Sequence, residues 1–453
     1  MTVLGVITIA LVAAAWLFRR GAIQYVLGVA AVFPQTAGLL IGDKGFPLFY
    51  LAIAVIAVLA VPRLLMALAR PQRAADEISP PRSVVDIVMV ALVVWAGVIS
   101  FAGPRIFAGL PVFDPSLGVD VQVGSLTPLA PTLGNTAQWG YLAIAAMFVI
   151  SAGRLFPVDK RIVDVLIWAT VILAGARLVA GGAWPLALVQ TMPGLPYQNG
   201  DRAAGTFYEP SVLGMYLTAA AAYFGAQLLM RRSGPAGRQR FAALIGLGLV
   251  AVLFVANGSG TALVGLGLVA GLGAVVLFVR VARQKRPQAR PLLIAGALAV
   301  TGAAITQVPA VLAYAVGMVE TKRESFSFVA RGASNQRSFE IVLDTWGLGV
   351  GLGGNRPSSL PLFVVSCLGV PGTALLIAVV VIAIVRAVRS GQLTSVWALL
   401  GGLTAGTVAV PDLSTPLIWV ALAACIAPAV VAVPPSPIDP LEHPAPRDRV
   451  AHG

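Results

Sequence analysis

Long runs of apolar residues, separated by short polar connections, dominate this chain. An apolar stretch of about 20 residues can cross the roughly 30 Å hydrocarbon layer of a membrane as a helix. Such stretches lie at 2–18, 21–41, 46–67, 84–101, 136–153, 162–182, 206–229, 241–257, 260–280, 291–315, 358–385, 394–411 and 416–433. The pattern therefore predicts an all-α fold, a polytopic transmembrane bundle of about 12–14 helices.

Basic residues fall in every second connection between these stretches. The basic connections are those around Arg19, Arg70, Lys160, Arg238, Lys285 and Arg386. Short loops rich in Lys and Arg stay in the cytoplasm, so we expect the N-terminus outside. This orientation places 22 of the 31 basic residues and 8 of the 18 acidic residues on the cytoplasmic side. The formal net charge of +13 then reflects membrane topology, and nucleic acid is not an expected partner.

Composition agrees with the apolar pattern, because 58% of the residues are hydrophobic and only 11% are charged. We expect a single multi-pass domain over residues 1–433 and a disordered cytoplasmic tail over 434–453. Both histidines, His443 and His452, lie in that tail. Both cysteines fall inside apolar runs and lack the spacing of metal ligands. No metal or other cofactor is therefore expected.

Three long connections remain on the expected outer side, namely 102–135, 183–205 and 316–357. Loops of this length in a helical bundle are usually functional or disordered. The first is rich in Pro and Gly, which predicts an irregular lid or spacer. The third is the most polar, and its segment 337–346 predicts a short amphipathic helix with Phe339, Leu343 and Trp346 on one face. The outer side is thus expected to be partly helical.

Arginines in two of these outer regions are the main candidates for chemistry. Arg202 opens the segment 202–214, and Arg337 precedes the glycine-rich segment 347–354. We expect both guanidinium groups to converge on an anion at the outer mouth of the bundle. Arg177 lies near the outer end of an apolar stretch, where its charge is costly unless it is paired or faces a cavity.

Each of these features has a structural alternative. An arginine outside a membrane often pairs with a nearby carboxylate or lies among lipid headgroups. Thr206 and Glu209 have the spacing of a capping box, in which the carboxylate bonds back to the N-cap amide. The glycines of 347–354 can bring backbone amides close to an anion or simply let the chain turn sharply. The sequence alone leaves these alternatives open.

These residues also carry a resemblance to a known family. Arg202-Ala-Ala-Gly-Thr-Phe-Tyr-Glu-Pro-Ser-Val-Leu-Gly214, then Asn257-Gly-Ser-Gly-Thr261, then Arg337 with Trp346-Gly-Leu-Gly-Val-Gly-Leu-Gly353 resemble, in this order, the bacterial O-antigen polymerase and ligase superfamily. The resemblance implies a membrane glycosyltransferase of the C type in the bacterial cytoplasmic membrane. Such an enzyme moves a glycan from an undecaprenyl diphosphate carrier to an acceptor sugar on the outer face, without a metal.

The chemistry implied by this resemblance assigns expected roles. A leaving diphosphate calls for preorganised guanidinium groups, and the candidates are Arg202, Arg337, Arg177 and Arg331. An attacking hydroxyl calls for a general base, and the candidates are Glu209, Glu340 and Asp344. O-antigen ligases resemble one another in an outer-loop histidine that this chain lacks, which favours a polymerase over a ligase. The Asn257 turn also lacks the arginine that follows it in relatives.

Two other classes of protein stay open. A polysaccharide or lipid transporter would also show many helices, Gly and Pro interruptions and outer arginines. The sequence shows neither a repeat of halves nor charges at midspan, the two marks of that class. A non-catalytic assembly subunit is the third reading. The expected partners are a lipid-linked oligosaccharide donor, a glycan acceptor and membrane lipid, with a chain-length regulator or a flippase as a further protein partner.

Overall fold

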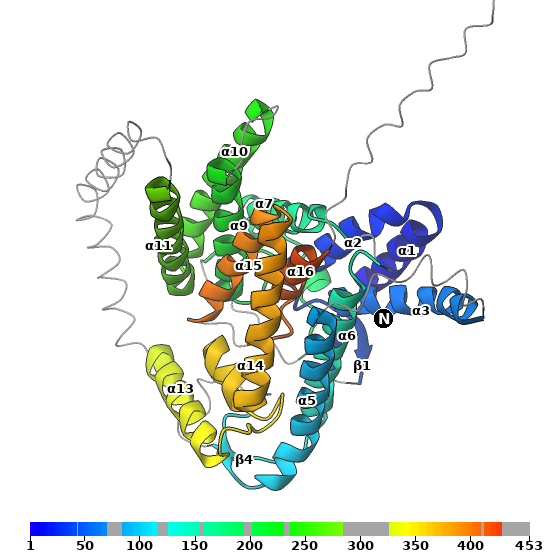
Figure 1. The fold of residues 1–453 in the computed structure, drawn as a ribbon, viewed down its shortest axis with the longest axis vertical. Helices are drawn as coiled ribbons and strands as arrows, with labels where there is room; N and C mark the ends of the chain where they lie inside the picture. The colour runs from blue at the N-terminus through cyan, green and yellow to red at the C-terminus, as the bar shows by residue number, and fades with distance from the viewer. Residues whose placement is uncertain are drawn as a thin grey trace, which may run out of the picture.

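A computed structural model describes residues 1–42, 44–69, 84–115, 126–154, 158–193, 202–230, 236–283, 326–408 and 412–427 (Figure 1). Helices dominate these residues, and the strands are few and short. The expected span at 291–315 and the expected tail at 434–453 lie outside the described residues.

The helices follow the apolar stretches. Those of fourteen residues or more are α1 (Val3–Phe18), α3 (Leu48–Ala69), α5 (Val84–Ile106), α6 (Leu133–Ser151), α7 (Arg161–Ala180), α9 (Pro210–Met230), α10 (Ala236–Asn257), α11 (Gly260–Arg283), α13 (Phe326–Asp344), α14 (Leu360–Arg389) and α15 (Leu393–Gly406). The shorter ones are α2 (Ile23–Ala30), α8 (Leu186–Val189) and α16 (Pro416–Ile426), with 3-10 turns η1 (Arg20–Ala22) and η3 (Gly181–Ala183). Within the described residues, six helices are long and apolar enough to cross a membrane, and five shorter apolar helices accompany them. This is the architecture of an all-α, multi-pass membrane protein.

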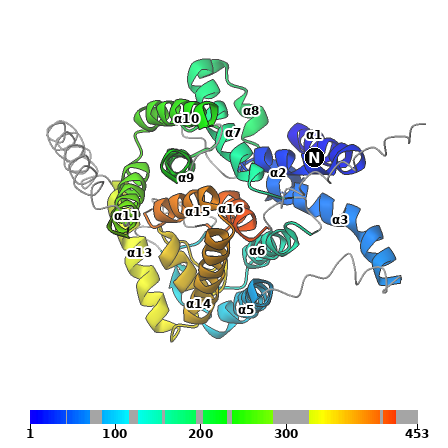
Figure 2. The same ribbon diagram turned by 45° about the horizontal axis from the view of Figure 1, so that its top comes forward.

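Helix α9 forms the centre of the bundle. Figure 2 shows it surrounded by α7, α10, α11 and α15, all of which contact it. In its most apolar window 78% of residues are buried inside the protein, against 22% in α10. Since both helices are apolar, the difference means that α10 presents most of its apolar surface outward, as a lipid-facing helix must.

Small residues let the central helices approach closely. A Cβ on Gly401 of α15 would lie 2.7 Å from the Cα of Ala219 in α9, and one on Gly214 would lie 3.0 Å from the Cβ of Ala262 in α11. Because lipid tails are as apolar as the side chains, helices in a membrane associate through this close packing. The glycine and alanine content of the apolar stretches is therefore part of the packing.

The expected span at 21–41 is not a continuous helix. Helix α2 ends at Ala30, and the chain continues through a non-helical segment, 31–36, into strand β1 (Ala37–Ile41), which pairs with β2 (Lys44–Pro47). Hydrogen bonds from the Thr2 amide and hydroxyl to the carbonyls of Gly38 and Ala37 place β1 beside the start of α1. The segment therefore returns along α1 as half helix and half extended chain, which hydropathy cannot distinguish from a helix.

The remaining strands and α13 close one end of the bundle. Strands β3 (Pro111–Val112) and β4 (Thr127–Pro128) pair within the connection expected to be irregular, and α13 packs against β3 and α14. Figure 1 shows β4 and α13 together at the lower end of the bundle. We call this end the loop side; it is the side that the charge pattern predicts to be outside. Helix α13 is longer than the expected 337–346 segment, because it begins at Phe326.

Candidate functional site

The segment that leads into α9 is tied to the turn between α10 and α11. Arg202 donates from Nε to the Asn257 carbonyl and from Nη2 to the Gly258 carbonyl, both at 3.0 Å. Asn257 in turn donates from Nδ2 to the carbonyls of Ala203 (2.7 Å) and Pro210 (2.9 Å). The carbonyls of Asn257 and Gly258 lie at the C-terminal end of α10, which attracts a cation. The two sequence motifs that open at Arg202 and Asn257 therefore form one local structure.

Glu209 lies directly before α9, and its carboxylate faces another helix. The predicted capping box with Thr206 does not form, because the Thr206 hydroxyl donates to the Val32 carbonyl and α9 begins only at Pro210. The Glu209 backbone carbonyl accepts the first amides of the helix, that of Val212 at 3.1 Å. The Glu209 side chain is therefore free of a capping role, and its Oε1 lies 3.4 Å from Nη2 of Arg331.

Two further side chains join this pair. The hydroxyl of Tyr208 lies close enough to the side chains of Glu209 and Arg356 for both charges to act on it. Arg356 follows the glycine run. Its backbone carbonyl accepts a hydrogen bond of 2.9 Å from the Ser334 hydroxyl of α13, which fixes its position. Together these side chains form what we call the Arg–Glu cluster, which consists of Arg202, Tyr208, Glu209, Arg331 and Arg356.

The electrostatics of the cluster favour an anion. Burial lowers the pKa of the Arg202 guanidinium, Glu209 opposes this shift and Arg331 adds to it, so all three groups act on one another. Burial raises the pKa of the Tyr208 hydroxyl, Glu209 raises it further and Arg356 lowers it, so the phenol stays protonated at neutral pH. The cluster thus contains three guanidinium groups and one carboxylate. Its surplus of positive charge suits a ligand with more than one negative charge.

Arg177 supports the cluster through the backbone. Its Nη1 donates to the carbonyl of Gly205 and, at 3.3 Å, to that of Phe207. Helix α7 therefore braces the loop that presents Tyr208 and Glu209. The cost of a charge near the end of a span is offset by these bonds to carbonyls.

The expected convergence of Arg202 and Arg337 is not found. Arg337 uses all three guanidinium nitrogens elsewhere: Nη1 lies 2.8 Å from Glu340, Nη2 lies 3.1 Å from Asp344, and Nε donates to the Pro111 carbonyl at 2.9 Å. The physical reason is the helix itself. Six residues separate Arg331 from Arg337, which at about 100° per residue turns them to different faces of α13. Glu340 and Asp344 accordingly lie in an ion-pair network of their own.

The glycine run 347–354 serves chain packing, the second of the two expected possibilities. Gly347, Gly349, Gly351 and Gly353 all have positive φ, from 72° to 88°. Amides of this run are already bonded, for example Gly351 to the Cys367 carbonyl at 2.8 Å. A Cβ on Gly351 would lie 2.6 Å from the Cα of Ser100. The run therefore passes between α5, α6 and α14 and places Arg356 at the cluster.

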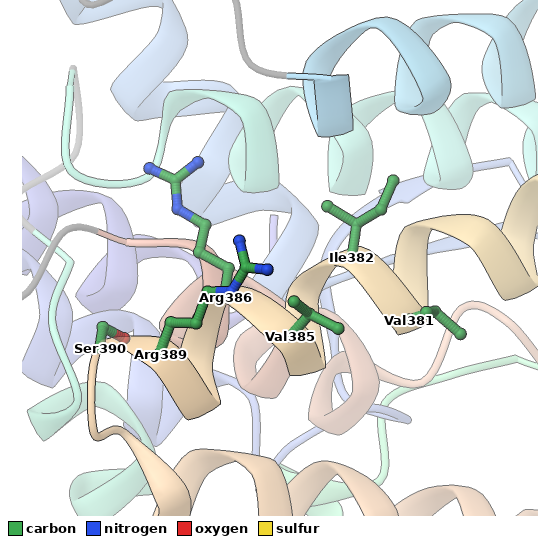
Figure 3. A pocket seen from close by; sticks show the side chains of 6 residues that line it. All are labelled: Val381, Ile382, Val385, Arg386, Arg389 and Ser390. Carbon is green, nitrogen blue, oxygen red and sulfur yellow. The ribbon is translucent and has the colours of Figure 1, made fainter.

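A surface hollow lies far along α14 from these residues. Its lining consists of Val381, Ile382, Val385, Arg386, Arg389 and Ser390, and its volume is about 600 Å³ (Figure 3). These residues all belong to one end of a single helix, the end predicted to be cytoplasmic. The hollow contains no carboxylate, so it does not offer acid–base chemistry. As for metals, the described part of the chain contains no group of three His, Cys, Asp or Glu side chains that could hold an ion.

Comparison with known proteins adds no family. No protein-family model matches this chain, and no curated protein sequence matches it. The architecture therefore assigns the chain to the class of multi-pass helical membrane proteins, and the resemblance to O-antigen polymerases and ligases remains an expectation.

Sequence reasoning missed Tyr208 and Arg356. Tyr208 lies beside a candidate base, and an aromatic residue there reads as part of the apolar span. Arg356 lies two residues beyond the glycine run and has no motif of its own. The available signal was its position in the sequence, because the path of a glycine run determines where the residue that follows it lies.

Proposed function

We propose that this protein is a membrane glycosyltransferase that polymerises or transfers undecaprenyl diphosphate-linked glycan units on the extracytoplasmic face. The Arg–Glu cluster carries the proposal, because it combines three guanidinium groups with one carboxylate beside the ends of apolar helices. A diphosphate is recognised by paired guanidinium groups, and its lipid chain needs an adjacent bilayer. The sequence has no histidine in its outer loops, which favours the polymerase over ligase-type transfer to a different acceptor.

The reaction has a simple balance of bonds and charge. The oxygen of an acceptor sugar hydroxyl forms a bond to the anomeric carbon of the donor glycan. The bond between that carbon and the diphosphate oxygen breaks, and the lipid diphosphate leaves with the electron pair. Glu209 takes the proton of the attacking hydroxyl, and Arg202, Arg331 and Arg356 stabilise the negative charge that grows on the leaving group.

The contact between Arg331 and Glu209 suits this division of roles. In the described structure the two side chains lie 3.4 Å apart, which is longer than a strong charge-assisted hydrogen bond. A bound diphosphate competes with Glu209 for the Arg331 guanidinium, because it offers more charge and more acceptor oxygens. Donor binding would then release the carboxylate for the incoming hydroxyl. The charges of Glu209 and Arg356 both act on the Tyr208 hydroxyl, so this phenol lies beside both the base and the anion site.

Two interrupted spans favour a second candidate, a transporter of the same lipid-linked glycan. The first is the break after α2, and the second is Gly369 in α14, where φ is 68° and ψ is −176°. Broken helices are common where transporters bind substrates within the membrane. Both proteins would bind the lipid diphosphate, but only the transferase would form a glycosidic bond.

An experiment in lipid nanodiscs separates the two candidates, because a nanodisc has no interior into which a lipid can be transported. The donor is the undecaprenyl diphosphate glycan extracted from producing cells that lack this chain. Purified wild type and the variants Glu209→Gln, Arg202→Ala and Arg337→Ala are incubated with it, and products are separated as a gel ladder. We expect ladder growth with wild type and Arg337→Ala, and strongly reduced growth with Glu209→Gln and Arg202→Ala.

Other outcomes have distinct meanings. Full ladder growth with Glu209→Gln removes Glu209 as the base. No growth with wild type, combined with movement of the same lipid across proteoliposomes, supports the transporter. Binding of the lipid without either activity supports the assembly subunit.

A further inference from the structure

Helix α13 has three distinct faces. Its inward face consists of small or aliphatic side chains that are fully buried: Ala330, Ser334, Ser338, Ile341 and Thr345. A polar face contains Arg337, Glu340 and Asp344, linked by the ion pairs described above. The third face is apolar and turned away from the protein. A helix between protein and water alone needs only two faces, so the third calls for a different environment.

The third face is strongly exposed. Phe339 is 58% exposed, Leu343 63% and Trp346 81%. Phe339 and Leu343 are four residues apart and so lie one above the other on the helix. We call these three residues the apolar face of α13. Their burial by some other medium would remove a large apolar area from water.

The backbone conformation at the end of α13 places Trp346 on this face. The Gly347 amide donates to the Val342 carbonyl at 2.8 Å and the Trp346 amide to the Leu343 carbonyl at 3.1 Å, the pattern of a Schellman motif. The residue with left-handed backbone in that motif is usually glycine, but here it is Trp346, with φ of 52°. Among the described residues, Trp346 is the only non-glycine residue with positive φ. A bulky aromatic in this conformation requires a compensating gain, which burial of the indole in lipid would supply.

The position of α13 identifies the medium. In Figure 2, α13 lies at the edge of the bundle, and it packs against α14. Trp346 contacts the ring of Phe107, at 5.9 Å between centroids, just beyond the end of α5. The neighbouring apolar residues Ile106, at the end of α5, and Val370, at the kink of α14, are exposed as well. The apolar face therefore continues the lipid-facing surface of the spans at the level where they end.

We propose that α13 is an interfacial helix, seated in the surface of the outer leaflet with Phe339, Leu343 and Trp346 in lipid and Glu340 and Asp344 toward water. An amphipathic helix with a hydrophobic face and a charged face lies in this position on a membrane. Tryptophan is enriched at this depth, because its ring is apolar and its N–H is polar. The inference is independent of the proposed transfer reaction. It also explains how a helix outside the membrane holds Arg331 at the depth of Glu209.

Site-directed spin labelling tests the proposal. The two native cysteines are fully buried, so a label reacts with an introduced cysteine. The variants are Phe339→Cys and Leu343→Cys on the apolar face, with Asp344→Cys as the matched control on the polar face, about 100° around the helix from Leu343. Each is labelled in phospholipid nanodiscs, and its collision rates with oxygen and with a water-soluble nickel chelate are measured. Oxygen concentrates in lipid and the chelate in water.

We expect the ratio of oxygen to chelate collisions at positions 339 and 343 to exceed that at position 344 at least several-fold. Equal ratios at all three positions would overturn the proposal, because the apolar face would then be in water. Exclusion of both reagents at 339 and 343 would also overturn it, because protein rather than lipid would cover the face. Gel filtration and the far-ultraviolet spectrum of each variant confirm that the fold is retained. Failure here leaves the transfer assay unaffected.

Discussion

Arg331 and Arg337 provide the sharpest test of the site, because both lie on α13 but their guanidinium groups contact different residues. Arg331 reaches Glu209 at 3.4 Å, with the two side chains 39% and 27% exposed. A pair so exposed contributes about 0.5–1 kcal/mol to stability. If Arg331 also stabilises a leaving diphosphate, Arg331→Ala removes one preorganised donor. Such a loss costs roughly 10²–10³ in rate, equivalent to about 3–4 kcal/mol in the transition state.

Arg337 is expected to behave in the opposite way. It is only 16% exposed and bonds two carboxylates and a backbone carbonyl. Loss of this network should cost roughly 1–2 kcal/mol of stability, since the two carboxylates freed by Arg337→Ala remain partly hydrated. Because these partners lie outside the Arg–Glu cluster, we expect the rate of Arg337→Ala to stay within a few-fold of wild type.

The assay measures both quantities on both variants. Initial rates of ladder growth in nanodiscs give the effect on the reaction, and melting temperatures in one detergent give the effect on stability. We expect Arg331→Ala to have the lower rate and Arg337→Ala the lower melting temperature. The reasoning is refuted if Arg331→Ala retains the wild-type rate, or if both variants lose rate equally. The second result would return Arg337 to the anion site expected from the sequence.

Three further predictions concern other parts of the loop side. Tyr208→Phe removes a hydroxyl that lies beside Glu209 and Arg356; we expect about a tenfold loss of rate, equivalent to roughly 1.4 kcal/mol, with the melting temperature nearly unchanged. The hydrogen bond from Arg337 holds the pKa of Glu340 below its ordinary value of 4.5. The folded state therefore binds fewer protons than the unfolded state, and the stability advantage of wild type over Glu340→Gln should shrink as pH falls from about 5 to about 3 in thermal unfolding. Gly351→Ala should destabilise by roughly 2–4 kcal/mol, since a left-handed backbone and an approach of 2.6 Å to Ser100 both exclude a Cβ. Gly248→Ala, in an open helical position, serves as its control and should not destabilise.

The spanning helices were the most predictable part of the fold. Long apolar runs are sufficient to locate them, because a segment in lipid must satisfy its backbone internally and the helix does so. The sequence failed at 21–41, where α2 ends at Ala30 and the chain becomes extended. There, side chains from distant segments satisfy the backbone, and such partners cannot be found from hydropathy.

The candidate site was predictable only in part. Arg202, Glu209 and Arg331 were among the candidates, and the structure brings them together. Arg337 was expected with them because the sequence shows which residues a loop contains. It does not show where a helix in that loop begins, and so it does not show which side chains share a face. The full length of α13, which begins at Phe326, determines those faces. Arg356 reaches the cluster through a glycine run whose path depends on packing against α5 and α14, and no local pattern encodes that path.

The break in the expected span 21–41 contributes to the site. The Tyr216 hydroxyl of α9 donates to the Ala31 carbonyl at 2.9 Å, and the Thr206 hydroxyl donates to that of Val32. In the same segment, the side-chain oxygen of Gln35 accepts the Tyr208 amide at 2.9 Å. Irregular backbone is tolerated at membrane depth only where protein or a cavity satisfies it. Here the partners are the residues that position Tyr208 and Glu209, so the unwound segment and the Arg–Glu cluster stabilise each other. A gate that opens and closes would have to break these bonds in each cycle, whereas a fixed catalytic site gains from keeping them, which favours the transferase over the transporter.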